Sequence, residues 1–255
     1  MKTLTRIGVL GLVAALAACN QDGTDPSNQL LDLTMDRDLA VQTADAAAED
    51  VELMGGAGGP LGLGFAAAAA EDDVPFRCGT HQRNNLTVVR TCTFKDAAGA
   101  TQTVYHPLTT ASATIHAEIN GSVTREHWSA EVSRVRDLVV SGLAGQETTR
   151  TWNGTGSGES TRERHTENGN REYQVEGAVT ITAVVIPVPR TDDTWPLSGT
   201  ISRQAKVTVV GGPNDGTVRE RTVTITFNGT RLVPITVNGK SFTFDLRTRR
   251  IVRDD

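Results

Sequence analysis

The residues best suited to hold a metal ion stand at alternate positions of one segment: Glu163, His165 and Glu167. On a strand these side chains share a face, with about 7 Å between neighbours. Carboxylate and imidazole groups bind divalent transition metals, but at that separation a bend or a ligand from another strand is needed. Three arginines accompany the group in the sequence: Arg162, Arg164 and Arg171. They favour a solvated row of opposite charges over a metal site, so we predict no metal and no other cofactor.

The remaining titratable residues form no recognisable catalytic pattern. The chain has no Gly-x-Ser-x-Gly elbow, no His-Glu-x-x-His pair and no glycine-rich phosphate loop. We interpret His116 with Glu118 as a surface pair, and Asp192-Asp193 before Trp195 as turn-forming polarity. A non-enzymatic role is therefore favoured. The alternative is an enzyme whose site is assembled across strands.

The first residues of the chain have the features of an export signal. Residues 1–6 carry two positive charges, and an apolar run of about a dozen residues follows from Ile7 to Ala18. A membrane-spanning helix needs roughly 20 apolar residues, so this run fits the core of a signal peptide instead. The run ends in Leu16-Ala17-Ala18-Cys19, which resembles the lipobox of bacterial lipoproteins.

The resemblance implies a lipid-anchored protein. In lipoproteins the thiol corresponding to Cys19 carries a diacylglyceryl group, cleavage removes residues 1–18, and the new amine receives a fatty acid such as palmitate. Two or three acyl chains hold a protein firmly on a membrane, whereas one binds only marginally. Residue 20 is Asn rather than Asp, which favours the outer membrane. An ordinary secretory signal that merely has Cys19 near its cleavage site is the alternative.

Two cysteines remain after Cys19 is assigned to lipid, and they form a pair. An exported protein folds in an oxidising compartment, which favours a disulfide between Cys78 and Cys92. The bridge closes a loop of about 15 residues and contributes roughly 3 kcal/mol in the chain-entropy model. A metal or redox site is the rival interpretation, but the sequence has no Cys-x-x-Cys and no further thiol.

Residues 19–75 are predicted to be an acidic leader. Residues 20–75 hold twelve acidic residues and one basic residue, whereas residues 76–255 hold 18 acidic against 22 basic residues. Residues 20–33 are polar and suit a tether, and a Gly- and Ala-rich linker begins at residue 55. Between them, apolar residues three and four apart predict a helix over 34–54, which either docks on the domain or a partner or forms only partly. The leader either stays away from anionic lipid or folds back on the basic domain, and no nucleic-acid surface is predicted.

Residues 76–255 have the two-residue alternation of β-strands. Turn signals separate about nine or ten strands, several longer than ten residues; they include the 96–100 loop, Asn120-Gly121 and Asn238-Gly239. The order of turns predicts an all-β, long-stranded antiparallel meander, in the form of a curved sheet, an open barrel or a sandwich. Three aromatic residues stand shortly before Gly-Thr, at 152–155, 195–200 and 227–230, and we interpret them as places where the sheet bends.

One face of this sheet is apolar apart from a few arginines. In the segment 218–227 that face carries Arg219, Arg221, Val223, Ile225 and Phe227, and threonines dominate the other. An apolar face needs a cover: closure of the sheet, a second sheet, or the 34–54 helix. We therefore expect an envelope lipoprotein that acts as a binding or structural module, with another envelope protein as its partner. The alternative is a carrier or receptor for an apolar ligand in the curved sheet.

Overall fold

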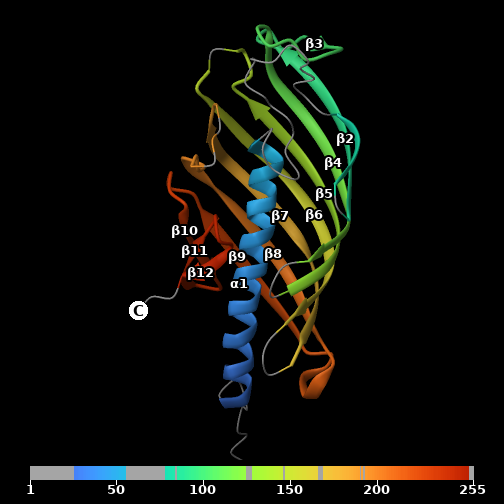
Figure 1. Ribbon diagram of the computed structural model, residues 1–255, viewed down its shortest axis with the longest axis vertical. Coiled ribbons are helices and arrows are strands. Elements are labelled where there is room, and N and C mark those ends of the chain that lie inside the picture. Colours follow the sequence, from blue (N-terminus) through green and yellow to red (C-terminus); the bar gives the residue numbers. More distant parts are fainter. Residues whose placement is uncertain are drawn as a thin grey trace, which may run out of the picture.

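A computed structural model describes residues 26–55, 78–83, 85–124, 128–145, 147–165, 169–189, 191 and 193–252. The predicted signal peptide, Cys19, Asn20 and most of the linker lie outside these residues. Within them the protein is one helix and a 12-stranded sheet (Figure 1). The elements are α1 (Pro26–Gly55), β1 (Gly79–Arg83), β2 (Leu86–Asp96), β3 (Thr101–Gln102), β4 (Thr110–Thr124), β5 (Trp128–Ser141), β6 (Thr149–Arg164), β7 (Arg171–Pro187), β8 (Ser198–Val210), η1 (Gly212–Asn214), β9 (Val218–Thr226), β10 (Leu232–Val237), β11 (Lys240–Asp245) and β12 (Arg250–Val252).

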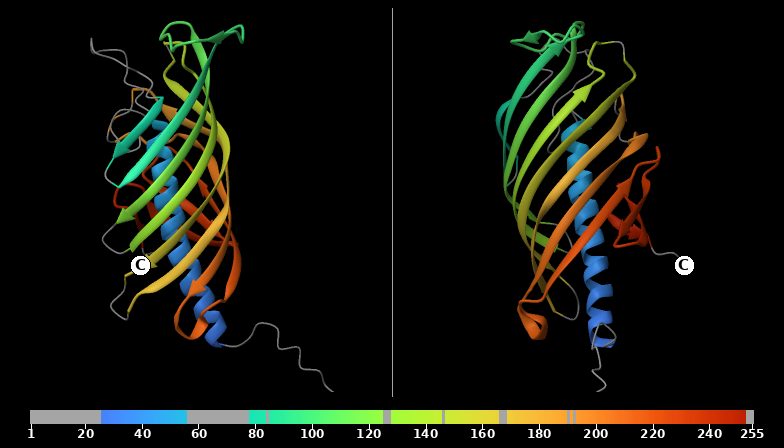
Figure 2. Two further views of the ribbon diagram at one scale, coloured as in Figure 1. Left: turned by 90° about the vertical axis from the view of Figure 1, so that its right-hand side faces the viewer. Right: turned by 180° about the vertical axis from the view of Figure 1, so that it is seen from behind.

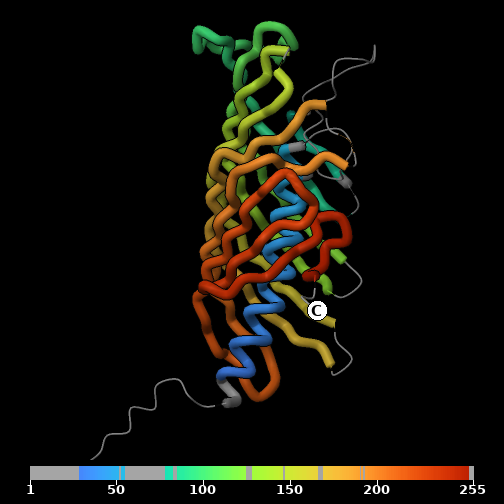
Figure 3. The backbone as a smooth tube through the Cα atoms, turned by 90° about the vertical axis from the view of Figure 1, so that its left-hand side faces the viewer, coloured from blue at the N-terminus to red at the C-terminus, as the bar shows by residue number. Residues whose placement is uncertain are grey.

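The sheet is an antiparallel meander, as predicted. Its strand order is β1-β2-β4-β5-β6-β7-β8-β9-β10-β11-β12, and β3 pairs with β2 away from this path. The sheet curves into a deep trough without closing, so β1 and β12 are its edges (Figure 2). The helix α1 lies along the trough, and β9 to β12 curl over it (Figure 3). Of the three covers that the sequence left open, the helix covers the apolar face.

The turn signals were reliable where the hairpin is short. Asn238 and Gly239 connect β10 to β11 with positive φ angles of 45° and 83°, as a tight hairpin turn requires. The prediction of a turn at Asn120-Gly121 was wrong, because β4 continues through both residues to Thr124. Gly121 pairs with Leu86, and a side chain at this glycine would collide with the Asn85 carbonyl oxygen. The glycine therefore serves a close approach of two strands.

Two of the three predicted bends coincide with irregularities in strand pairing. The register between β6 and β7 shifts between Trp152 and Gly154. The register between β7 and β8 shifts between Thr182 and Val185, where Gly199 adopts a positive φ of 99°. Bulges increase local twist and bend a strand, which helps the long strands to wrap around the helix.

The helix begins at Pro26, eight residues before the predicted start. The interpretation of residues 26–33 as tether was therefore wrong; proline is tolerated at the first helical position, where its missing N–H needs no partner. Most side chains between Met35 and Met54 are buried. Apolar residues of the predicted stripe, such as Ala40, Ala44 and Val51, lie in the core with residues of the sheet.

The predicted disulfide is present. Cys78 and Cys92 are bonded, with their Cα atoms 6.0 Å apart. The bridge ties the residue before β1 to the middle of β2, and both cysteines pack against the main core. It therefore fixes the edge of the sheet that the chain enters first.

Candidate functional site

The helix and the trough meet through a row of ion pairs. We call the surface of the sheet that faces α1 the inner face. Buried carboxylates of the helix stand opposite arginines of this face: Asp36, Asp38, Asp45, Glu49 and Asp50. The acidic leader therefore folds back on the basic sheet, which was one of the two arrangements that its charge allowed.

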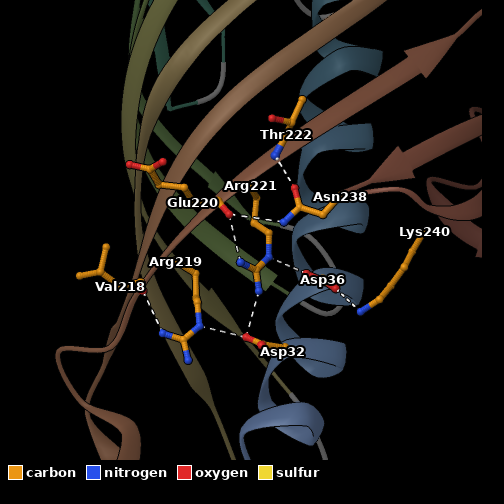
Figure 4. A network of polar contacts seen from close by, with 9 residues as sticks. All are labelled: Asp32, Asp36, Val218, Arg219, Glu220, Arg221, Thr222, Asn238 and Lys240. Carbon is orange, nitrogen blue, oxygen red and sulfur yellow. Dashed lines mark hydrogen bonds and ion pairs between the residues drawn. The ribbon is translucent and has the colours of Figure 1, made fainter. Parts of the chain in front are cut away.

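At the start of the helix, Asp32 and Asp36 bind cations of β9 and β11 (Figure 4). Arg219 Nε and Arg221 Nη2 each donate to Asp32 Oδ1 over 3.0 Å. Arg221 Nε donates to Asp36 Oδ1 over 2.6 Å, and Lys240 Nζ donates to the other oxygen over 2.6 Å. These contacts hold the first turns of α1 against the strands that curl over it.

Two residues after Asp36, Asp38 is held by β6 and β7. Arg171 donates two hydrogen bonds to its carboxylate, of 2.8 and 3.0 Å, and the Tyr173 hydroxyl donates a third of 3.0 Å. Arg164 Nε lies 3.8 Å away. Burial, together with Asp38, raises the pKa of Tyr173 to about 12, so the hydroxyl keeps the proton that it donates.

Near the end of the helix three acids bind four arginines. Glu49 accepts from Arg134 Nη1 over 2.6 Å, and Asp45 accepts from Arg249 Nη1 over 2.5 Å. Asp50 binds two guanidiniums, Arg136 Nε at 3.0 Å and Arg203 Nη2. Burial alone would raise the pKa of Glu49 and Asp50, but the neighbouring arginines outweigh it and hold both pKa values below their usual range.

Glycines of β6 make room for the long side chains of β5. Gly154, Gly156 and Gly158 alternate along the inner face, beside Leu138, Arg136 and Arg134. A Cβ at Gly156 would lie 2.8 Å from Arg136 Cδ, and one at Gly158 would lie 3.0 Å from Arg134 Cγ. Two guanidiniums can therefore lie along the sheet under the helix.

A small cavity of about 50 Å³ remains between α1 and the sheet. Four arginines and one glutamine among its lining residues each have one buried nitrogen without a hydrogen-bond partner in the described part of the chain. These nitrogens are Gln42 Nε2, Arg134 Nη2, Arg136 Nη2, Arg162 Nη1 and Arg203 Nε. All five are donors, so the cavity wall presents N–H groups and positive charge.

Positive charge exceeds negative charge around this cavity. Glu49 and Asp50 pair with three of the four arginines, whereas Arg162 forms no ion pair with a described residue. Arg162 donates from Nε to Ser160 and lies over the Trp128 ring, 5.3 Å from its centroid. Burial, reinforced by Arg134, lowers the pKa of Arg162 to about 10.

Arg203 is also buried among other guanidiniums. Its carboxylate partner Asp50 favours the charged form. Burial and three neighbouring guanidiniums outweigh that partner and lower the pKa of Arg203 to about 9. At neutral pH both arginines stay protonated, so the wall of the cavity carries their full charge.

The groups that the sequence singled out for chemistry lie elsewhere. Glu163, at the end of β6, accepts a hydrogen bond from Asn170 Nδ2, His165 follows the strand, and Glu167 lies outside the described residues. Among the residues with described positions, no three His, Cys, Asp or Glu side chains are placed to hold a metal. His116 forms the expected surface contact with Glu118, at 3.6 Å, and a closer contact with Asp137, at 2.7 Å, that was not predicted. Asp193 pairs with Arg247, and Asp192 is not among the described residues.

The residues that border the cavity were not predicted from the sequence. A usable signal was present in β5, because Arg134 and Arg136 occupy the same alternate positions as Val132 and Leu138, which belong to the apolar face. An arginine with the alternation of a buried face needs a buried partner. The acidic helix was the source of such partners, whereas Gln42 gave no signal in the sequence.

In the part of the chain with described structure, no helix has both the length and the apolar character needed to cross a membrane. No protein-family model matches the chain, and no curated protein or solved structure matches it either.

Proposed function

We propose that the protein is a lipoprotein of the cell envelope, anchored through acyl chains on Cys19, and that it acts as a binding or structural module rather than as an enzyme. The anchor rests on the lipobox-like residues 16–19. The non-enzymatic role rests on one observation: the chain's own helix fills the trough of the sheet and binds its arginines. A curved sheet would hold a substrate on its concave side, but in this protein the concave side packs against α1.

The start of α1 supports a position close to the membrane. Pro26 is seven residues after Cys19, and seven residues span at most about 25 Å when fully extended. The helix is bound to the sheet from Asp32 onward. A lipid on Cys19 would therefore hold the folded body near the membrane surface, on a shorter connection than the tether predicted over residues 20–33.

The surface left for a partner is the outer face of the sheet, which is polar. A shallow groove of about 610 Å³ crosses it over β5 to β8. Its exposed carboxylates include Glu131, Glu159 and Glu176, and Lys206 binds Glu176 over 2.5 Å. Such a surface suits a polar envelope partner. A carrier for an apolar ligand is less well supported, because it would need α1 to leave the trough.

The anchor is tested by making the full chain in a Gram-negative host. We expect material in the membrane fraction whose intact mass corresponds to loss of residues 1–18 and addition of acyl groups. The matched variant Cys19→Ala should lack the added mass and leave the outer-membrane fraction. An unprocessed Met1 terminus or an unmodified Cys19 thiol on the wild-type protein would refute the anchor.

The non-enzymatic role is tested separately with the same purified full chain. Turnover of a panel of ester, glycoside and peptide substrates would refute a non-enzymatic role. Native mass spectrometry after gentle isolation addresses the carrier alternative, which predicts co-purified lipid in excess of the covalently attached chains. We expect neither turnover nor bound lipid.

A further inference from the structure

We propose that the cavity between α1 and the inner face of the sheet binds one small inorganic oxyanion, of the size of phosphate or sulfate. The inference goes beyond the proposed function and does not depend on Cys19. It rests on four arginines and one glutamine, from four different elements, that line a single cavity and each have an unpartnered buried N–H.

The donors surround the cavity from both sides. Gln42 belongs to the helix, Arg134 and Arg136 to β5, Arg162 to β6 and Arg203 to β8. Small residues lie beside Arg134 on the next three strands. Gly158 of β6, Gly177 of β7 and Ala205 of β8 follow it as cross-strand neighbours in register. With little or no side chain at these positions, space remains between α1 and the sheet at the cavity.

The charge of the site favours an anion over water alone. Arg134, Arg136 and Arg162 are 5%, 1% and 6% exposed. A buried charge without a compensating partner is costly, and Arg162 has no ion pair within the described structure. An oxyanion would neutralise part of this charge, and its oxygens would accept the unpartnered N–H groups. The planar guanidinium is the side chain best matched to such oxygens.

The volume limits the size of the anion. A cavity needs roughly 10–15 Å³ to hold one water, whose share of liquid volume is about 30 Å³, so about 50 Å³ accommodates one or two waters or a single small anion. A sugar phosphate or nucleotide exceeds this volume. The volume therefore fits a free inorganic oxyanion rather than the headgroup of a larger molecule.

The first test compares the full chain with Arg162→Met in thermal unfolding and in calorimetric titration with phosphate. Wild-type protein should show a saturable rise in Tm with phosphate, because a ligand of the native state stabilises it by mass action. Arg162→Met should weaken phosphate binding by about tenfold or more, since a charged hydrogen-bond donor is lost. Without phosphate, this variant should unfold at the same or a higher temperature than the wild type, because it removes an unpaired buried charge.

A second variant, Gln42→Glu, is isosteric and places a carboxylate at the cavity. It should raise Tm in phosphate-free buffer and abolish the response to phosphate, because the new carboxylate occupies the position of the anion. Two controls are matched in charge. Gln174→Glu adds the same charge on the outer face of β7, and Arg219→Gln removes a guanidinium that lies outside the cavity. Both should bind phosphate with unchanged affinity.

Three results would overturn the proposal. The first is a wild-type Tm that does not respond to phosphate or sulfate, which would mean that water satisfies the donors. The second is an equal response to chloride at matched ionic strength, which would indicate general screening. The third is undiminished phosphate binding by both Arg162→Met and Gln42→Glu.

Discussion

Arg136 Nε donates to Asp50 Oδ1 across 3.0 Å, and the two side chains are 1% and 2% exposed although 86 residues separate them in the chain. Asp50 also binds Arg203, so one helix carboxylate joins β5 and β8. Removing one partner from a buried ion pair leaves an uncompensated charge in the interior. We therefore regard Asp50 as the residue on which docking of α1 depends most.

Asp50→Ala should lower the free energy of unfolding by about 3–5 kcal/mol, because it leaves Arg136 and Arg203 buried without their carboxylate. Urea denaturation of the full chain measures this change. The control is Asp137→Ala, whose side chain is 61% exposed on the outer face. It should cost less than about 1 kcal/mol. If Asp50→Ala lowered the free energy of unfolding as little as Asp137→Ala does, docking of the helix would contribute little to the stability of the fold.

Acid should destabilise the protein because Glu49 and Asp50 have lowered pKa values in the folded state, through Arg134, Arg136 and Arg203. Their ordinary values are 4.5 and 3.8. Above these values both states are ionised, and the stabilisation is fully present. Below these values the unfolded chain binds protons more readily than the folded chain. The free energy of unfolding therefore decreases as the pH falls towards the lowered pKa values of the folded state.

Circular dichroism melting curves between neutral pH and about pH 3 test this pH dependence. We expect Tm to fall steeply only in the acidic part of the range. The decline should be shallower in Asp50→Ala, which has lost one of the two titrating groups. A wild-type Tm that is constant down to the lowest pH contradicts the prediction.

The sequence predicted the sheet better than the contacts beneath it. Strict alternation in 218–227 identified the inner face correctly, and it placed Arg221 among residues that are indeed buried. The partners of these arginines could not be predicted, because pairing Arg221 with Asp36 depends on how a helix lies across strands 185 residues away. Local signals failed for the same reason at Asn120-Gly121, where pairing with β2 overrides the tendency of Asn-Gly to turn.

His116 should titrate above the ordinary imidazole value of 6.5. Its hydrogen bond to Asp137 is the main cause of the raised pKa, and Glu118 adds to it. A proton NMR titration of the ring measures this value, and Asp137→Asn should bring it back towards 6.5. The pair stabilises the fold at pH values below 6.5 and loses that effect as the pH rises through the raised pKa; because both groups are about half exposed, the contribution to stability is small. A His116 pKa at or below 6.5 in the wild type contradicts the prediction.

Gly156→Ala should test whether the glycines of β6 exist to admit the arginines of β5. A methyl group at this position would lie 2.8 Å from Arg136 Cδ, and it would also collide with the Val135 carbonyl oxygen. Overpacking of this kind costs about 1–3 kcal/mol. Ser157→Ala is the neighbouring control, because Ser157 is exposed on the outer face. Its unfolding free energy should change by less than about 0.5 kcal/mol.

A double-mutant cycle with Arg136→Ala separates the two collisions. If the methyl group acts mainly by displacing the arginine, the cost of Gly156→Ala should shrink once that side chain is shortened, giving a coupling of at least about 0.5 kcal/mol. Strictly additive losses would assign the whole cost to the collision with the backbone. The glycine would then be required by the curvature of the sheet and not by the guanidinium beneath the helix.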